Sequence, residues 1–282
     1  MIAAEDRIDR GKVAVVIPVV DRALELGRAL ASVRAQTRKV DQVVVVDDAS
    51  AVTLESRYCW PPGSTEQLSI VRVDTKLGAS AARNLGMECT TAEFVFFLDS
   101  DDLWSNNHVW LSMAELSNPG ELVVSSSVTV SACGRVFVQR LRHLTPKRVL
   151  RRRHGICPTS AFALRRDERT SSLKFNPDLA ALQDYAFLVS AIELGVDIRT
   201  QPAVTVVRMD PLSGDRVFNS ERAVGAALEV RKQYGALLGT RTWTAMWFRL
   251  AIYRDSRHRP KCKVFGRFST LLRTKTRRGN EP

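Results

Sequence analysis

The most constraining feature of this 282-residue chain is an apolar run that leads directly into a group of acids. Residues 94–98 are all apolar, and carboxylates follow at Asp99, Asp101 and Asp102. An uninterrupted run of this kind predicts a strand that is buried on both faces. Because isolated charges are costly to bury, the acids must lie beyond the buried part of the strand. The pattern therefore places carboxylates at the carboxyl edge of a sheet, where open α/β folds bind ligands.

The spacing of two of these acids favours a metal site. Asp99 and Asp101 are two positions apart, so their side chains point the same way off the end of a strand. Converging carboxylate oxygens suit Mg²⁺ or Mn²⁺, and such an ion in turn binds a diphosphate. We therefore predict a divalent-cation site at Asp99 and Asp101.

Short apolar segments alternate with amphipathic ones along the chain. The expected strands cover residues 13–17, 43–46, 68–73, 93–98, 122–130, 136–141, 159–164 and 203–207. The expected helices cover residues 26–33, 79–89, 107–116, 182–194 and 220–238. The early β-α-β alternation predicts parallel strands with right-handed crossovers. The expected fold class is therefore α/β, with a Rossmann-like, mostly parallel sheet, flanking helices and a helical C-terminal extension.

The positive charge of the chain is unevenly distributed. The formal net charge is +12, but residues 241–282 carry +10 and residues 135–153 carry +8, so the remainder carries −6. An acidic body with two basic segments argues against uniform coating by nucleic acid. The distribution fits an acidic metal site together with surfaces that meet something anionic.

Cysteine usage and the N-terminus indicate a cytoplasmic protein. The five cysteines are widely spaced and lack metal-ligand spacing, which favours reduced thiols. Residues 1–12 are charged and contain no apolar stretch typical of a signal peptide. No stretch approaches the ~20 apolar residues that cross a bilayer. We expect a protein that is at most peripheral on the inner face of the cell membrane.

The C-terminal region combines aromatic residues with cations. Residues 243–253 are apolar and aromatic, and ten Lys or Arg residues follow between positions 254 and 278. This combination is typical of a helix that lies in a membrane interface. The alternative is a helix packed on the domain, followed by a solvated basic tail. Residues 274–282 are expected to be disordered.

Six motifs between residues 13 and 195 resemble, in order, those of family 2 glycosyltransferases of the GT-A fold. They are Val16-Ile17-Pro18-Val19-Val20-Asp21 (V-I-P-x-Y-N), Ser32 with Gln36-Thr37 (S-x-x-x-Q-T), Val45-Val46-Asp47-Asp48-Ala49-Ser50 (V-V-D-D-G-S), residues 77–86 (G-x-S-x-A-R-N-x-G), residues 98–104 (L-D-S-D-D-x-W), and Gln183-Asp184-Tyr185 with Gly195 (E-D-Y … G). The departures are Asp21 for Asn, Ala49 for Gly, Ala51-Val52 after the serine, and Gln183 for Glu. A Gln-x-x-Arg-Trp motif is absent from the sequence, so the resemblance does not extend to processive synthases.

The resemblance implies a nucleoside site at the ends of the first two strands. Pro18 and Val19 would contact the nucleoside through their backbone, together with Asp21. Asp48 would accept a hydrogen bond from the imide N–H of a uracil-type base. The alternatives are that Asp21 caps a helix and that Asp47 and Asp48 form a turn at a strand end.

The resemblance also implies a diphosphate and metal site. Gly78 permits close backbone approach where a helix begins, and helix N-termini attract phosphate. Arg83, one turn further on, has the shape for a diphosphate fork; alternatively it pairs with an acid of the 99–102 loop. Asp101 would bind the cation directly, and Asp99 would meet the ribose or the water shell of the metal.

Asp184 is implied as the general base. A carboxylate at a helix start is also favoured by the helix dipole alone, which is the structural alternative. Partial desolvation by Leu182 and Tyr185 would raise its pKa towards a useful range.

The expected activity is transfer of a sugar, with inversion, from a nucleoside-diphosphate sugar, most simply a UDP-sugar. The acceptor would be a hydroxyl of a lipid-linked or growing glycan, and the reaction would use Mn²⁺ or Mg²⁺. The expected catalytic domain is 1–212, with a donor-binding half at about 12–104 and an acceptor-side half at 105–212, followed by a basic extension at 213–282. Bacterial envelope or exopolysaccharide assembly follows from family association alone.

Three other functional classes remain as alternatives. A non-catalytic scaffold would bind an anionic partner through the basic tail and would not need the acids. A sugar-nucleotide pyrophosphorylase would need a glycine-rich loop after the first strand, where residues 18–21 contain no glycine. A nucleic-acid binder would be compatible with the net charge, but the sequence contains no recognised binding motif for it.

Overall fold

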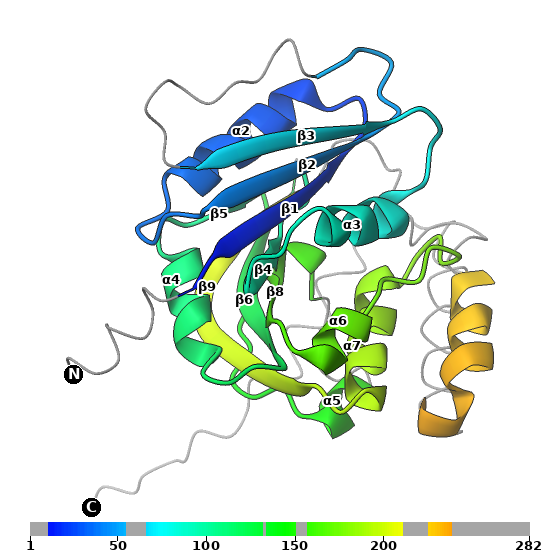
Figure 1. Cartoon of the computed structure of the whole chain (residues 1–282). Helices are drawn as coiled ribbons and strands as arrows, with labels where there is room; N and C mark the ends of the chain where they lie inside the picture. The colour runs from blue at the N-terminus through cyan, green and yellow to red at the C-terminus, as the bar shows by residue number, and fades with distance from the viewer. Residues whose placement is uncertain (1–10, 55–65, 132–133, 151–156, 211–224, 239–282) are drawn as a thin grey trace, which may run out of the picture.

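The structure is a computed structural model that describes residues 11–54, 66–131, 134–150, 157–210 and 225–238 (Figure 1). The strands in this part of the chain are β1 Val13–Val19, β2 Gln42–Asp48, β3 Gln67–Val73, β4 Phe94–Phe97, β5 Asp102–Trp104, β6 Glu121–Ser131, β7 Val136–Gln139, β8 Phe162–Arg165 and β9 Asp197–Asp210. The helices are α2 Ala23–Arg34, α3 Ala79–Glu88, α4 His108–Glu115, α5 Pro146–Leu150, α6 Glu168–Ser172, α7 Gln183–Glu193 and the 3₁₀ turn η1 Thr159–Ala161, and residues 225–238 are also helical.

The strands form one mixed sheet with the order β3-β2-β1-β4-β8-β6-β9-β5, and β7 pairs with β6 outside this path. Strands β1 to β4 are parallel to one another, as the β-α-β pattern predicts. Beyond β4 the pairing changes, because β8 runs antiparallel to both β4 and β6. The parallel half thus occupies one side of the sheet, and the mixed half the other.

Alternating residues of β2 explain how helices cover both faces of the parallel half. Val43 and Val45 belong to the main core together with Leu26 of α2. Val44 and Val46 instead cluster with Ala82 of α3. Because successive side chains of a strand point to opposite faces, α2 and α3 lie on opposite sides of the sheet (Figure 1). This layering leaves the carboxyl ends of β1, β2 and β4 at one edge between the helices.

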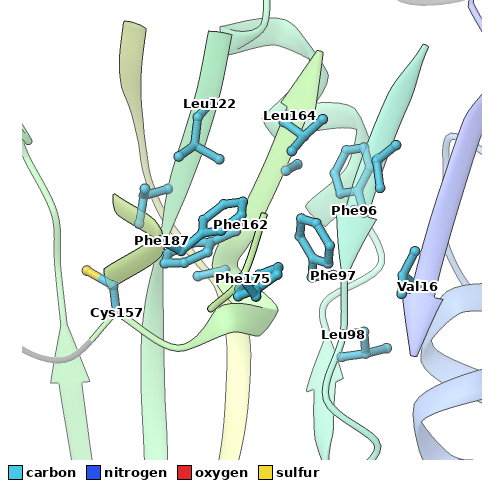
Figure 2. Packing of buried hydrophobic residues seen from close by; sticks show 14 of the residues in the cluster. Val16, Phe96, Phe97, Leu98, Leu122, Cys157, Phe162, Leu164, Phe175 and Phe187 are labelled. Carbon is cyan, nitrogen blue, oxygen red and sulfur yellow. The ribbon is translucent and has the colours of Figure 1, made fainter. Parts of the chain in front are cut away.

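An aromatic cluster fixes α7 against the centre of the sheet. Phe187 of α7 stacks on Phe175, with ring centroids 4.0 Å apart, and on Phe162 at 5.9 Å. Phe97, at the end of β4, meets the Phe175 ring edge-on at 5.2 Å (Figure 2). All four rings are fully buried. The start of α7 is therefore held in a defined position relative to the residues that follow β4.

The expected elements within the described residues are present, with shifted bounds. The segment expected as a strand at 159–164 divides into η1 and β8, and β9 is longer than expected. The sequence patterns did not predict β5, α5 or α6. The helix expected from Ser220 is described from residue 225 onward.

Several expectations lie outside the described residues. They concern the helix cap at Ser220, the membrane helix and basic segment at 243–278, and disorder at 274–282. The expected domain boundary at residue 212 also falls in such a stretch, 211–224. Among the helices that are described, none has the length and hydropathy needed to span a bilayer.

Candidate active site

Asp48 joins the end of β2 to the start of α3. Its Oδ1 accepts the backbone N–H of Leu77 at 2.6 Å, and its Oδ2 accepts the backbone N–H of Gly78 at 3.0 Å. Gly78 precedes α3 with a φ of +85°, a conformation that glycine adopts without strain. A carboxylate has about four acceptor positions, so these two bonds leave capacity for a ligand N–H. The contact to a nucleobase stays a prediction.

The side chain of Asp47 holds the turn that follows β2. Its side chain is 1% exposed, accepts the backbone N–H of Ser50 at 3.0 Å, and forms an ion pair with Arg72 at 2.7 Å. Arg72 also donates to the carbonyl of Ser50 at 2.8 Å. These bonds make the turn at the strand end that was the alternative interpretation for the acid pair. Ala49 lies inside the turn with a φ of +55°.

Asp21 ties the loop after β1 to the loop after β2. It has a φ of +53°, its backbone N–H donates to Ser50 Oγ at 3.0 Å, and its Oδ1 accepts the N–H of Ala51 at 2.7 Å. The residue that caps α2 is Arg22, and it makes no side-chain cap bond. Asp21 therefore links two loops and does not cap a helix.

Pro18 and Val19 end the first strand beside the second. Both are buried, and they pair in parallel register with Val46 and Asp47. The two residues predicted for backbone contacts with a nucleoside therefore lie next to the Asp47-Asp48 strand end.

The acidic loop after β4 is a tight turn held by Ser160. Asp102 N–H donates to the carbonyl of Asp99 at 3.0 Å. Ser160 Oγ accepts the N–H of Asp99 at 3.0 Å and donates to Asp102 Oδ2 at 2.6 Å. Arginines neutralise the other two carboxylates, because Asp99 pairs with Arg83 and Asp101 pairs with Arg22.

The electrostatics of this loop reflect crowded carboxylates. Burial raises the pKa of Asp102 to about 8, with a further contribution from the charge of Asp99. Burial and then the charge of Asp99 also raise the pKa of Asp101, while Arg22 opposes the shift. Both pKa values are raised because the loop concentrates negative charge in a partly desolvated place, where a divalent cation would be stabilised.

The donor chemistry of the loop fits Mg²⁺ or Mn²⁺. The side chains of Asp99 and Asp101 are each 28% exposed and present hard oxygens. Within the described ranges, no group of three or more His, Cys, Asp or Glu side chains is arranged to hold a metal. These ions commonly take one or two carboxylates and complete their shell with water and substrate phosphate. Asp101 and Asp99 are the residues that would hold such an ion.

Arg83 connects the two halves of the site. It is 5% exposed, pairs with Asp99, and donates from Nη1 to Gln183 Oε1 at 3.2 Å. Its guanidinium lies 5.3 Å from the centroid of the Phe175 ring. The alternative interpretation of Arg83, a pairing with an acid of the loop, is therefore present in the structure. A diphosphate contact stays a prediction.

Asp184 follows Gln183 in the first turn of α7 and is partly buried. Its flanking residues Leu182 and Tyr185 are 4% and 2% exposed, as the desolvation hypothesis requires. Leu182 has a φ of +61°, so α7 begins from a strained backbone position. Burial and then the charge of Asp184 raise the pKa of Cys157 to about 12, which keeps that thiol protonated.

Sequence reasoning missed three participants. Arg22 pairs with Asp101 across 79 positions, and Ser160 bonds to the acidic loop across about 60. Arg208 lies opposite Asp102 in the β5–β9 pairing, and its charge lowers the pKa of both Asp101 and Asp102. No local pattern marks these residues, because each meets the loop only through the fold.

A separate cleft of about 470 Å³ lies between the segment before α7, the end of α7 and the helix at 225–238. Its lining includes Lys174, Glu193, Glu229 and Tyr234, and none of the predicted site residues. The carboxylates and arginines of the candidate site gather elsewhere, at the sheet edge.

The architecture and the strand-end acids define the class of protein. TarS of S. aureus in complex with UDP-GlcNAc shares the fold with a TM-score of 0.64 at 16% identity, covering 93% of this chain and 76% of that chain. The mannosyltransferase PcManGT from Pyrobaculum calidifontis, in complex with GDP-Man and Mn²⁺, shares it with a TM-score of 0.63 at 19% identity, covering 88% and 73%. The fold is the GT-A fold of glycosyltransferases.

The family follows from the sequence comparison. The model of glycosyl transferase family 2 matches residues 14–169, and the chain belongs to that family. The amylovoran biosynthesis glycosyltransferase AmsB of Erwinia amylovora is 29% identical over 199 residues, 64% of this chain and 64% of that protein. The succinoglycan biosynthesis protein ExoW of Rhizobium meliloti is 37% identical over 102 residues, 35% of this chain and 32% of that protein. The matches thus cover less than two thirds of these relatives.

Proposed function

We propose that this chain is a non-processive glycosyltransferase that moves a sugar, with inversion, from a nucleoside-diphosphate sugar to a hydroxyl acceptor. The observation that carries the proposal is the continuous contact from Gln183 through Arg83 to Asp99. It joins the acids at the sheet edge to the helix that carries Asp184. Candidate groups for donor binding and for deprotonation of an acceptor therefore lie on adjoining elements.

The donor nucleotide would lie across the ends of β1 and β2. Asp48 is fixed by two backbone N–H groups and would accept a third hydrogen bond from the base. Pro18, Val19 and Asp21 would form the adjoining wall, and Gly78 with the start of α3 would approach the diphosphate. The ligands named in the TarS and PcManGT structures are UDP-GlcNAc and GDP-Man. Sugar nucleotides of uridine and guanosine are therefore the first candidate donors.

The acidic loop would hold a divalent cation through Asp101 and Asp99. Bound Mn²⁺ or Mg²⁺ would supply Lewis-acid neutralisation of the charge that develops on the leaving diphosphate. Arg83 lies against Asp99 and would keep that carboxylate oriented. Ser160 holds the turn, so the two acids keep their relative position.

Asp184 would remove the proton from the acceptor hydroxyl. The freed oxygen would attack the anomeric carbon from the face opposite the diphosphate, which inverts the configuration. The partly buried position of Asp184, beside two buried apolar residues, supports a role as base because desolvation favours proton uptake.

The remaining parts of the proposal concern the acceptor. Residues 1–212 would form the catalytic domain, and residues 213–282 would shape the acceptor site and contact a membrane surface through 243–278. A lipid-linked or growing glycan is the acceptor that fits such an arrangement. The relatives AmsB and ExoW are named for polysaccharide biosynthesis, which supports the same class of acceptor.

Calorimetric binding of UDP, with and without Mn²⁺, tests the donor site. The comparison uses the wild type, Asp101→Ala and the control Asp178→Ala, which removes an exposed carboxylate outside the acidic loop. We expect Mn²⁺-dependent binding in the wild type and the control, and its loss in Asp101→Ala.

Other results would change the proposal. Binding of GDP or dTDP in place of UDP would keep the enzyme and change the donor. No binding of any nucleotide would contradict the transferase and favour the non-catalytic scaffold.

A further inference from the structure

The outer part of the mixed sheet exposes an apolar face made by three strands. In the hydrogen-bonded register, Val130 of β6 lies between Val136 of β7 and Met209 of β9. The next row of the same face places Val128 between Val138 and Val207. Directly opposite residues in neighbouring strands share a face of the sheet. We call these six residues the β7 face: Val128, Val130, Val136, Val138, Val207 and Met209.

Three of the six residues of the β7 face are exposed to solvent, and Val128, Val130 and Val207 are half-buried. Val136 is 59% exposed, Val138 is 54% exposed and Met209 is 44% exposed. The neighbouring β7 residue Phe137 points to the other side of the strand and is 44% exposed. Contiguous apolar exposure on an edge strand is a liability that proteins retain where the surface meets a partner.

The charges around the β7 face specify what that partner is. Arg135 lies just before β7, and Arg140 and Arg142 follow it; all three are exposed. The described stretch 134–150, which contains β7 and the residues that follow it, has five Lys or Arg and not one Asp or Glu. A partner that covers the apolar face must therefore carry negative charge around an apolar interior, which describes a bilayer of anionic lipid.

A second copy of the chain fits this surface poorly. Antiparallel pairing of two β7 strands would bring Arg135 of one copy next to Arg140 of the other. Like charges opposite each other across paired strands are destabilising. The apolar area alone would permit self-association, but the charge distribution opposes it.

We propose that the β7 face docks on an anionic lipid bilayer. The valines and Met209 enter the interfacial layer, and Arg135, Arg140 and Arg142 contact the phosphate groups of the lipids. This surface is separate from the basic C-terminal segment, and docking does not depend on any transferase activity.

The register also relates the docking surface to the acidic loop. In the strand register, Asp102 of β5 lies opposite Arg208 of β9, and Arg208 lies opposite Thr129 of β6. Thr129 in turn lies opposite Phe137 of β7. Three strand spacings of about 4.8 Å place the loop roughly 15 Å from β7 along the sheet. On the proposed function, a docked chain would hold its acidic loop close to acceptors that are anchored in the membrane.

Co-sedimentation of the full chain with lipid vesicles tests the proposal. The vesicles contain either phosphatidylcholine alone or equal parts of phosphatidylcholine and phosphatidylglycerol. We expect binding to the mixed vesicles only. The double variant Val136→Ser/Val138→Ser should weaken vesicle binding about tenfold because apolar burial is lost. The double variant Arg140→Gln/Arg142→Gln should weaken vesicle binding about fivefold for each arginine removed, because each contacts anionic lipid.

The control is Leu24→Ser, which removes an 80% exposed leucine of α2 and should leave vesicle binding unchanged. Thermal melting and UDP binding of each variant separate docking from folding and from the donor site. Unchanged vesicle binding in both double variants would overturn the proposal and assign any binding to another segment. If Val136→Ser/Val138→Ser instead abolished a dimer seen by sedimentation velocity, without affecting vesicle binding, the occupant would be a second copy.

Discussion

The side chain of Gln183 bridges two groups, because its Oε1 accepts from Arg83 at 3.2 Å while its Nε2 donates to the carbonyl of Leu179 at 2.8 Å. This arrangement fixes the orientation of the amide. Because the Gln183 side chain is neutral, Asp99 supplies the negative charge that pairs with Arg83. A glutamate at this position, as in the family motif, would be a second anion for Arg83 and would face the Leu179 carbonyl with no donor.

Arg83 and Gln183 are expected to be energetically coupled. Hydrogen bonds to a charged partner contribute about 2 kcal/mol, and residues in direct contact show non-additive effects. In a double-mutant cycle with Arg83→Lys and Gln183→Met, urea unfolding should give a coupling free energy of about 1 kcal/mol. Additive effects of the two changes would show that the contact does not contribute to stability.

Gly86 is expected to be required for the contact between α3 and β1. A Cβ at this position would lie 2.3 Å from Val16 Cγ1. Gly86→Ala should therefore lower the free energy of unfolding by about 2 kcal/mol. Gly235→Ala is the matched control, because a Cβ there meets nothing within 4 Å, and it should stabilise its helix slightly. The added change Val16→Ala should restore part of the loss in Gly86→Ala; a stable single variant would contradict the packing argument.

Replacing Ala49 with glycine is expected to stabilise the protein. Its φ of +55° costs about 1 kcal/mol for an L-residue, and part of the gain is offset by the larger entropy of a glycine in the unfolded chain. Ala49→Gly should raise the free energy of unfolding by about 0.5 kcal/mol, measured in urea. Ala51→Gly, at a residue without a positive φ, should not stabilise. Equal effects at both positions would argue against strain at Ala49.

The burial of His108 is expected to make the protein less stable in mild acid. Complete burial lowers its pKa to about 3, from an ordinary value of 6.5, while its Nδ1 contacts Thr205 Oγ1 at 2.8 Å. Below pH 6.5 the unfolded chain binds a proton that the folded chain excludes. The free energy of unfolding therefore decreases as the pH is lowered. Between pH 6.5 and about pH 5 this amounts to about 2 kcal/mol.

The measurement compares urea unfolding of the wild type and His108→Gln across this pH range. The introduced glutamine can still hydrogen-bond but cannot titrate, so the difference between the two proteins isolates the histidine. We expect the difference to change with pH in favour of the variant as the solution becomes more acidic. A constant difference would mean that His108 does not cause the acid sensitivity.

Arg22 is expected to compete with a cation for Asp101. Their ion pair neutralises the carboxylate that is the first candidate ligand. Arg22→Ala should therefore bind Mn²⁺ severalfold more tightly, as followed by the paramagnetic signal of the free ion. Arg28→Ala, at an exposed arginine of the same helix, should leave the affinity unchanged. Weaker Mn²⁺ binding by Arg22→Ala would indicate that the arginine orients Asp101 for the metal instead of blocking it.

The parallel half of the fold could be predicted from local patterns. Strands β1, β2 and β4 contain continuous apolar runs because both of their faces are covered, and the helices between them carry an apolar stripe. Strand β3, at the edge of the sheet, is only half-buried and includes Ser69 and Arg72. Strand β5 has three residues and no usable periodicity, so no local pattern indicated it. The motifs that end β1, β2 and β4 do lie at one sheet edge, since parallel strands end together.

The contacts of the site were harder to predict than its location. Asp21 binds Ala51 and Asp101 binds Arg22, and both pairings depend on how distant loops approach each other. Residue type alone left two interpretations for Arg83. The fold shows that the ion pair with Asp99 forms, and the diphosphate contact stays a prediction. Side-chain partners far apart in sequence follow from tertiary packing, which a single sequence does not encode locally.

Three residues with a left-handed backbone adjoin this site: Asp21, Ala49 and Leu182. They are the non-glycine residues of positive φ in the described part of the chain, and each lies within two positions of a predicted ligand-binding or catalytic residue. Hydrogen bonds and packing in the folded protein maintain these conformations, so the loops are already ordered before any ligand arrives. Nucleotide binding should then involve little loss of backbone entropy and a small heat-capacity change, as in a preorganised site.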